Sequence, residues 1–481
     1  MGKTALYLGY FCLYSFVLLI IGKGSLKGQS TPEDYFICSH QVPLPQCVCT
    51  FAGTWLSAIT ILSLTGSIYE NGLSSLSYSV IPWFLGGFSL ACIARRIHRS
   101  RAITVPEYFR ARFGSERLQE IYGAVFIVVY ISYLVPQFVG FGMVASELFR
   151  IPYSAAVLMV GLFIMYTTFG GYRSVLRTDM FNLLLLTVSL IFLCAVLVGR
   201  TGGFLSLYRS AAAVTLSARG PDAPPMEPGQ MLRLFSERFT PLYCFSMFWG
   251  WGLGLSANPQ YLVRILSAKD GNTARKTVLC SLALLFVIYF ALVHIGLSLR
   301  VLVPSLPEDV PTDAILIRLI NNELYGPWSG LLFFSVIGAC VSTANSQLLM
   351  VAESFSYDLA APLSKGKLSR TRIVTLARIT VGAAGVLVML LTMNPPEVAL
   401  NYGSDIWGLI AILVFPPLYG SLYTERVTLK GVQASITAGF ISVALFYPSY
   451  YTGHLTLHPA MFGVLISSAA LFLFSKKEAR Q

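Results

Sequence analysis

The chain has 481 residues, of which 55% are hydrophobic and only 12% are charged. Soluble domains carry charge on about a quarter of their residues, so this composition excludes a soluble fold. The formal net charge of +12 does not indicate nucleic acid as a partner, because the basic residues lie in short loops between apolar runs, where they set membrane topology.

Apolar runs of roughly 20 residues recur along the whole chain, and each is long enough to cross a hydrocarbon core about 30 Å thick. We therefore predict a single membrane domain over residues 1–481, an all-α polytopic fold with about thirteen transmembrane helices in the lipid bilayer. In chain order the predicted spans are 4–22, 44–69, 73–94, 119–149, 152–170, 174–199, 239–263, 277–303, 328–360, 373–393, 397–420, 431–449 and 457–475.

An odd number of spans places the two termini on opposite faces of the membrane. Most Lys and Arg residues gather on one of these faces, including the four arginines within 95–101 and Arg264. The other face carries an acidic loop with Glu308, Asp309 and Asp313. Basic loops mark the cytoplasmic side, so the sequence predicts a cell-membrane protein with its N-terminus outside and its C-terminus in the cytoplasm.

Membrane enzymes need a nucleophile with a base, or metal ligands, and the five histidines include no HExxH motif, since the one close pair, His454 and His458, lies in HLTLH. We therefore do not predict an enzyme. A transporter needs unwound backbone at mid-membrane depth, with hydroxyl or carboxylate oxygens available to an ion. Four segments of the chain fit that requirement.

The first segment runs from Phe51 to Leu73, where Gly, Ser and Thr weaken helix propensity inside one predicted span. A break near residues 53–57 would leave backbone carbonyls free. The alternative is that the small residues form a face that packs against another helix.

The second segment runs from Phe245 to Ile265 and combines a run of three alternating glycines with Asn258-Pro259. Proline removes a backbone donor and clashes with the preceding turn, so we predict a discontinuous helix here.

These two interrupted spans each open a run of five helices, the pattern of an inverted repeat with a central site. The predicted first repeat covers 44–174 with 174–199 as its fifth helix, and the second repeat covers 239–420. One peripheral helix, 4–22, precedes the repeats, and two, within 431–475, follow them.

The third segment, from Gly338 to Leu359, places small and hydroxyl residues on one helix face, because three- and four-residue spacings are neighbours. Their oxygens are hard ligands, suited to a small alkali or alkaline-earth cation. The alternative is that the hydroxyls bond carbonyls one turn back and the face merely packs. The residues concerned are Ala339, Ser342, Thr343 and Ser346.

The fourth segment, from Gly170 to Asn182, contains Asp179 about one turn inside its predicted span. An unpaired carboxylate there is costly, which makes Asp179 a functional candidate. The alternative is an interfacial ion pair with Arg173 or Arg177.

At these positions the sequence resembles the sodium:solute symporter family. GGYRSVLRTDMFN resembles the family's GG-x-x-AV-x-x-TD-x-x-Q, with Ser174 for Ala and Asn182 for Gln. VSTANSQLL resembles its ST-x-x-S-x-L helix, and GLGLSANPQYLVR its G-x-G-x-x-x-x-P-x-x-x-x-R. Two stretches, Gln137–Tyr153 and Asn394–Glu397, look most like the sodium/pantothenate branch. The stretch WGLGLSANP places the sodium/proline branch second.

The resemblance implies thirteen helices built on two inverted five-helix repeats with broken first helices. It implies a first sodium site made of the carbonyls of Gly53, Leu56 and Ala339 and the hydroxyls of Ser342 and Thr343. A second sodium site, present in some members, would use Asp179, Ser342, Asn345 and Ser346. Asn345 departs from the serine of two-site members.

By the same resemblance, the substrate would bind between the broken helices. The residues implied are Ser57, Thr60, Gln137, Trp251 and Leu255. Trp55 stands where the proline branch has an acidic residue, and Leu255 replaces an aromatic residue of that branch. Both departures argue against proline as the substrate.

The predicted function is sodium-coupled import of a small organic solute, a pantothenate-like carboxylate or an amino acid, by alternating access in a monomer. The sequence contains no GxxxxGK[ST] motif, so nothing in it indicates ATP as the energy source. Two alternatives remain: a proton-coupled transporter of the same fold, with Asp179 carrying the proton, and a cation channel.

Overall fold

The computed structural model describes most of the chain, and the described residues are helical apart from loops and one isolated β-bridge between Val42 and Ala268. The described ranges are 2–23, 30–219, 224–306, 311–393 and 400–475. The predicted stretch Asn394–Glu397 and the acidic residues Glu308 and Asp309 lie outside them.

Each predicted span contains a helix. The uninterrupted ones are α1 (Lys3–Lys23), α5 (Ile81–Arg99), α7 (Glu116–Phe149), α8 (Tyr153–Thr168), α9 (Gly171–Arg200), α13 (Gly271–Leu302), α15 (Leu331–Glu353), α17 (Arg370–Thr392), α20 (Leu429–Tyr451) and α21 (Pro459–Phe474). The interrupted ones are α3 (Leu44–Trp55) with α4 (Leu64–Asn71), α11 (Pro241–Ser256) with α12 (Pro259–Leu266), and α18 (Leu400–Leu413) with α19 (Phe415–Tyr423).

By length and composition, eight of the described helices can cross a membrane, or ten spans if each of two bent pairs counts as one. Two shorter apolar helices, α8 and α21, and the α11–α12 pair complete the predicted set. The bend in α18–α19, 43°, was not predicted; Pro416 and Pro417 directly follow the break and cannot donate to the preceding turn.

Short helices connect the spans. They are α2 (Pro32–Ile37), α6 (Val105–Phe113), α10 (Phe204–Ala212), α14 (Ile315–Arg318) and α16 (Ala361–Leu363). Several spans also contain a π-helical turn, at Ile59–Ser63, Leu76–Val80 and Ser354–Ala360. A π turn adds a residue to the helix and so rotates the face that follows it.

Helix starts are capped by short polar side chains. Asp270 accepts hydrogen bonds from the backbone N–H groups of Asn272 and Thr273 at the start of α13, and Thr104 accepts one from the Glu107 N–H at the start of α6. These bonds satisfy orphan donors of the first turn. Hydrogen bonds from Thr273 and Asn272 also hold the pKa of Asp270, which lies in a loop, below its usual range.

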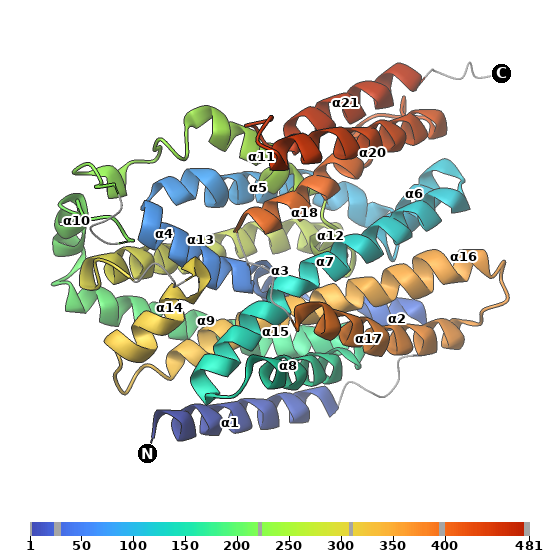
Figure 1. The fold of residues 1–481 in the computed structure, drawn as a ribbon. Helices are drawn as coiled ribbons and strands as arrows, with labels where there is room; N and C mark the ends of the chain where they lie inside the picture. The colour runs from blue at the N-terminus through green and yellow to red at the C-terminus, as the bar shows by residue number, and fades with distance from the viewer. Residues whose placement is uncertain (1, 24–29, 220–223, 307–310, 394–399, 476–481) are drawn as a thin grey trace.

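The helices form one bundle, with the start of α1 at one end and the end of α21 at the other (Figure 1). The short helices α10 and α14 lie at the N-terminal end, and α6 and α16 at the opposite end. At the centre, α15 packs against α3, α7 and α9, while α11 packs against α5 and α18. In the most apolar part of the span Leu331–Leu363, which contains α15, 89% of the residues are buried, whereas the corresponding share in α1 is 22%.

Glycines bring α11 close to its neighbours. A Cβ atom at Gly86 of α5 would lie 2.3 Å from the carbonyl oxygen of Gly252, and one at Gly254 would lie 2.3 Å from the carbonyl oxygen of Trp407 on α18. No real Cβ comes that close to a backbone oxygen, so any larger residue would push these helices apart. The alternating glycines therefore permit tight packing around the break.

Candidate functional site

The first broken helix is interrupted where its composition predicted. Helix α3 ends at Trp55, and Leu56 is extended with φ −83° and ψ 109°. The chain becomes helical again by the π turn at Ile59–Ser63, and the two segments meet at an angle of 61°. Carbonyls at the end of a helix have no intrahelical partner, so this break exposes acceptors inside the bundle.

Two hydroxyls of α15 face this break and the neighbouring helix α9. The Thr343 hydroxyl donates to the carbonyl oxygen of Leu56 at 2.8 Å and to that of Thr54 at 3.3 Å. The Ser342 hydroxyl donates to Asp179 at 2.6 Å. Both side chains therefore reach across to other helices and not to the turn behind them.

Gly53 and Ala339 lie beside these groups. A Cβ atom at Gly53 would lie 3.0 Å from the Ser342 hydroxyl and 3.7 Å from Asp179, so the absence of a side chain lets α3, α9 and α15 meet here. Ala339 is buried one turn before Thr343. The structure thus brings Gly53 to Ser342 and Leu56 to Thr343, which are four of the five residues implied for a first sodium site, and Ala339 lies one turn away on α15.

Asp179 is fully buried. Its two carboxylate oxygens accept hydrogen bonds from Ser342 at 2.6 Å and from Thr50 at 2.5 Å. Because α9 begins at Gly171, Asp179 lies about 12 Å along the helix, which is deeper than the one turn expected from the sequence. The hydrogen bonds described for its oxygens come from these two hydroxyls, and Arg173 and Arg177 lie on α9 itself and not in a loop.

Three of the residues implied for a second sodium site lie together, because Asp179 and the Ser346 hydroxyl both contact Ser342, but Asn345 contacts a different helix. The side-chain oxygen of Asn345 accepts from Thr167 at 2.7 Å and from Thr168 at 3.0 Å, both on α8. Ser346 instead contacts the Thr54 hydroxyl at 2.9 Å and accepts a hydrogen bond from Arg264. Asn345 thus binds α8 with the oxygen that a cation would need.

Arg264 is a correction to the sequence analysis, which placed it among the basic residues of the loops. It is fully buried on α12. Its guanidinium donates to Ser346 and, at 2.7 Å, to the carbonyl oxygen of Gln260, and it lies over the Tyr172 ring at 5.4 Å. The sequence carries a local signal for this burial, because Arg264 follows Pro259 within an apolar stretch.

The second broken helix is also interrupted as predicted, between Ser256 and Pro259. Asn258 caps α12, accepting from the Gln260 N–H at 3.2 Å, and it also accepts from the Tyr130 hydroxyl at 2.7 Å. This break is closed by local and neighbouring hydrogen bonds.

Trp251 is buried on α11 before that break, and its indole ring packs between those of two other tryptophans. It makes edge-to-face contacts with Trp83 of α5 at 5.1 Å and with Trp407 of α18 at 5.0 Å. A Cβ atom at Gly403 would lie 2.7 Å from Trp251 and 3.0 Å from Ile59. Trp251 therefore lies next to the helix segment that follows the first break.

The other residues implied for substrate binding lie near the first break. The hydroxyls of Ser57 and Thr60 lie 3.4 Å apart, and the Gln137 side-chain oxygen accepts from the Ala58 N–H at 3.0 Å. Leu255 is fully buried one turn after Trp251, but no described contact joins it to the others.

Sequence reasoning missed several aromatic residues of this region. Trp83 and Trp407 flank Trp251, Tyr133 lies 6.0 Å from Trp407, and Tyr289 accepts a 3.1 Å hydrogen bond from the Trp55 indole. Aromatic residues are common in membrane helices, so nothing in the spacing of these four separates them from lipid-facing rings.

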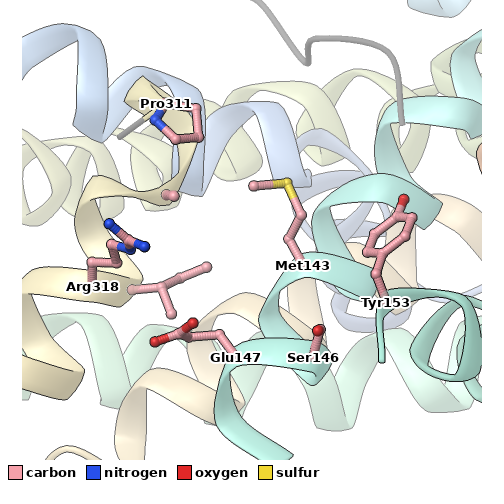
Figure 2. A pocket seen from close by; sticks show the side chains of 8 residues that line it. Met143, Ser146, Glu147, Tyr153, Pro311 and Arg318 are labelled. Carbon is pink, nitrogen blue, oxygen red and sulfur yellow. The ribbon is translucent and has the colours of Figure 1, made fainter. Parts of the chain in front are cut away.

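A pocket of about 240 Å³ opens between α7 and α14, farther along α7 than Gln137. Figure 2 shows Glu147 and Arg318 extending into it from different walls. Its lining residues are Met143, Ser146, Glu147, Tyr153, Pro311, Ala314, Ile317 and Arg318.

Comparisons with known proteins agree with this architecture. The family model described as the sodium:solute symporter family matches residues 35–439. Sodium/proline symporters of Staphylococcus aureus, among them those of strains JH9 and Newman, are 24% identical over 449 residues, covering 90% of this chain and 84% of theirs. They represent the branch that the motifs placed second, and nothing among these matches names the pantothenate branch.

Two solved structures share the fold. A Na⁺-coupled sialic acid symporter in a substrate-bound outward-open state superposes with a TM-score of 0.80 at 20% identity, covering 99% of this chain and 96% of that one. A nucleobase-cation-symport-1 family transporter in a closed conformation gives a TM-score of 0.54 at 14% identity, covering 94% and 96%. The family and these neighbours are transporters and not enzymes. Because the family match extends over most of its length, the chain belongs to the sodium:solute symporter family.

Proposed function

We propose that the protein imports a small organic solute together with sodium, by alternating access. The observation that carries this proposal is the meeting of Thr343 with the open backbone of the first break, where its hydroxyl lies 2.8 Å from the Leu56 carbonyl oxygen. Hydroxyl and carbonyl oxygens are hard ligands, suited to an alkali cation and unsuited to soft metals. The family match and the named relatives support sodium as the coupling ion.

In this proposal the sodium ion binds between α3 and α15. Its ligands are the carbonyls of Gly53, Leu56 and Ala339 and the hydroxyls of Ser342 and Thr343. Asp179 holds the Ser342 hydroxyl and adds a negative charge beside the ion. Ion binding replaces the Thr343–Leu56 hydrogen bond with coordination of both oxygens.

We propose that Asp179, Ser342, Asn345 and Ser346 tune this ion and do not form an obligatory second site. The Asn345 oxygen is occupied by Thr167 and Thr168, and Ser346 accepts from a guanidinium that already carries a positive charge. One sodium ion per cycle is the expected stoichiometry.

The proposed solute lies among Ser57, Thr60, Gln137, Trp251 and Leu255. Three buried donors have no hydrogen-bond acceptor in the described part of the chain: the indole N–H groups of Trp83 and Trp251 and the side-chain nitrogen of Gln137. Unpaired buried donors are costly, and a carboxylate would satisfy them. The site therefore favours a solute with a carboxylate at one end and an apolar part that packs on indole.

That class includes amino acids, which are the substrates named for the Staphylococcus aureus relatives, and pantothenate-like acids. Trp55 donates to Tyr289 and contacts the Phe51 and Tyr261 rings, so an aromatic cluster stands where the proline branch has a carboxylate. Without that carboxylate, an amino group of the solute has no acidic partner at this position. We therefore favour an acid over a zwitterion.

In the proposed cycle, sodium binding stabilises the state that accepts solute from outside, and the two halves then rock to open inward. Coupling requires sodium to bind the solute-ready state more tightly than the empty inward-facing state. The pocket at Glu147 and Arg318 provides an outer approach along α7. The protein works as a monomer in the cell membrane, with its N-terminus outside and its C-terminus in the cytoplasm.

Uptake into proteoliposomes tests this function. Purified protein is given an inward gradient of sodium, of protons, or of potassium as the control, with labelled pantothenate and labelled proline offered separately. We expect uptake of the acid to follow the sodium gradient. Uptake that follows only the proton gradient would contradict sodium coupling, and sodium current without solute would indicate a channel.

A further inference from the structure

A buried polar cluster joins the last two helices to the core of the bundle. Helices α20 and α21 pack against α18, and α21 also packs against α11. His458, which directly precedes α21, is fully buried, and its Nε2 atom lies 3.3 Å from a carboxylate oxygen of Asp405 on α18. The Tyr451 hydroxyl donates to the other oxygen of that carboxylate at 2.5 Å. This cluster lies outside the cation and solute residues described above.

Hydrogen bonding at His458 fixes which ring nitrogen carries the proton. The Nδ1 atom accepts from the Ala460 N–H at 3.2 Å and so caps the start of α21. An accepting nitrogen has no proton, so the neutral ring carries its proton on Nε2, the nitrogen that faces Asp405. Nε2 finds no aligned acceptor among the described residues, so packing holds that edge of the ring. One edge of the imidazole therefore caps a helix, and the other fills space.

Two glycines make room for the second edge. A Cβ atom at Gly250 of α11 would lie 2.6 Å from the Cε1 atom of His458, and one at Gly408 of α18 would lie 2.9 Å from the same atom. Real Cβ atoms essentially never come that close to another heavy atom. The imidazole therefore packs directly on the backbones of both α11 and α18.

Each of these glycines is the chain neighbour of a tryptophan near the first break. Trp251 follows Gly250 on α11, and Trp407 precedes Gly408 on α18. The two indole rings meet edge to face at 5.0 Å. Because a packed helix shifts as a rigid segment, the separation of α11 and α18 at the glycines also sets the separation of the two indoles.

The backbone of His458 is tied to the same face of α11. Its N–H donates to the Ser246 hydroxyl at 3.1 Å, and that hydroxyl donates to the carbonyl oxygen of Tyr243 at 2.7 Å. Ser246 and Gly250 are four residues apart, so they lie on one face of the helix. The place of the ring beside Gly250 is therefore set by a hydrogen bond from the same residue.

We propose that His458 is a positioning residue for solute binding, a spacer between α11 and α18 that holds Trp251 and Trp407 against the solute. The inference rests on the proposed solute site. It gives the α20–α21 pair, which carries none of the residues proposed to touch sodium or solute, a share in solute affinity and none in sodium affinity.

Two isosteric substitutions separate the two edges of the ring. His458→Asn places an acceptor oxygen at the position of Nδ1 and keeps the cap, but it removes the edge that contacts the glycines. We expect it to raise the solute concentration for half-maximal uptake by about tenfold, with external sodium half-saturation within about twofold of wild type, because the indoles lose their support. The probe is labelled pantothenate, or labelled proline if the wild type prefers it.

His458→Gln has the opposite design, since its amide lies at the position of Nε2 and the cap is lost. It should lower the melting temperature by a few degrees and leave solute half-saturation within about twofold of wild type. His454→Asn, which changes an exposed histidine of the same loop, is the matched control and should change none of these quantities. Equal rises in solute half-saturation for His458→Asn and His458→Gln would overturn the inference, because the cap would then be the cause.

A methyl group at Gly250 tests the contact from the side of α11. Gly250→Ala should raise solute half-saturation in the wild type, and should raise it much less in the His458→Asn background, where the Cε1 atom that it meets is gone. Gly250→Ala also remains a test if His458→Asn does not fold. Unchanged solute half-saturation in either single variant, or equal changes for solute and sodium, would overturn the inference. An error in the proposed solute site looks different, because Trp251→Ala would then leave solute half-saturation unchanged as well.

Discussion

The two interrupted helices occupy corresponding places in the two halves of the chain, yet their breaks are built differently. In the first, Leu56 is extended and its carbonyl accepts from Thr343 of a different helix. In the second, the N–H groups of Ala257 and Asn258 donate to carbonyls of the preceding turn, and Asn258 caps the helix that follows. The first break is open to a partner, and the second is closed.

This difference separates two tasks that a symporter must combine. An open break supplies acceptors whose best partner is a cation, whereas a closed break supplies a rigid corner that positions side chains. Trp251 before the second break and Arg264 after it both depend on that corner. In the proposed function, the same local device, a helix broken by Gly or Pro, serves ion binding in one half and side-chain placement in the other.

Removing the hydroxyls that face the open break should have the largest effect. We expect Ser342→Ala combined with Thr343→Ala to raise the external sodium concentration for half-maximal uptake by about 100-fold, which corresponds to about 2.8 kcal/mol, because two of five oxygen ligands are lost. Measuring uptake over a range of external sodium concentrations gives this half-maximal value. Ser435→Ala, which removes a buried hydroxyl paired with Ser467 at 2.8 Å in the peripheral helices, is the control. An unchanged sodium requirement in the double variant would remove the cation assignment from the first break.

The side chain held by the closed break should affect solute more than sodium. We expect Trp251→Ala to weaken solute half-saturation by roughly 30-fold, about 2 kcal/mol, with sodium half-saturation changed less than about threefold. Because a Trp→Ala change in a core costs about 3–5 kcal/mol of stability, binding must be normalised to folded protein. Trp249→Ala changes a half-buried indole two residues away and serves as the comparison. If both variants bind solute like wild type, the solute lies elsewhere.

Asp179 connects the open break to α9, and its replacement should modulate transport without abolishing it. Asp179→Asn keeps an acceptor for one of the two hydroxyls, Ser342 or Thr50, and removes the charge, so we expect a sodium half-saturation about three- to tenfold higher. Hill coefficients for sodium at two pH values distinguish the roles. A lower coefficient indicates a second ion, a flattened pH profile indicates a carried proton, and no change in either indicates a purely structural residue.

The smallest effect is expected at the closed break itself. Asn258→Ala removes the cap of α12 and should cost about 1 kcal/mol of stability, lowering the melting temperature by a few degrees. External sodium half-saturation should not change, because the hydrogen bonds of the described residues join no carbonyl of this break to Ser342 or Thr343. Thermal unfolding in detergent measures the first expectation and uptake the second. A large rise in the sodium requirement would show that the two breaks are not functionally distinct.

The sequence by itself determined the helical spans, the two breaks and the family. Apolar runs, helix-weakening Gly and Ser, and the Asn258-Pro259 pair act within a few residues of where they stand, so their effects can be read locally. The break after Trp55 and the break before Pro259 were predicted for this reason. The bend at Pro416 and Pro417 was missed although its signal is equally local.

Only the tertiary structure decided which side chains meet. Asn345 and Ser346 are adjacent in the chain, yet one binds α8 and the other faces Arg264. Trp83, Trp251 and Trp407 become one cluster although more than 150 residues separate each from the next. Such contacts depend on how each helix is rotated about its axis, and π turns change that rotation without leaving a clear mark in the sequence. The apolar pattern makes a span a helix, but packing between distant helices selects the face that becomes a site.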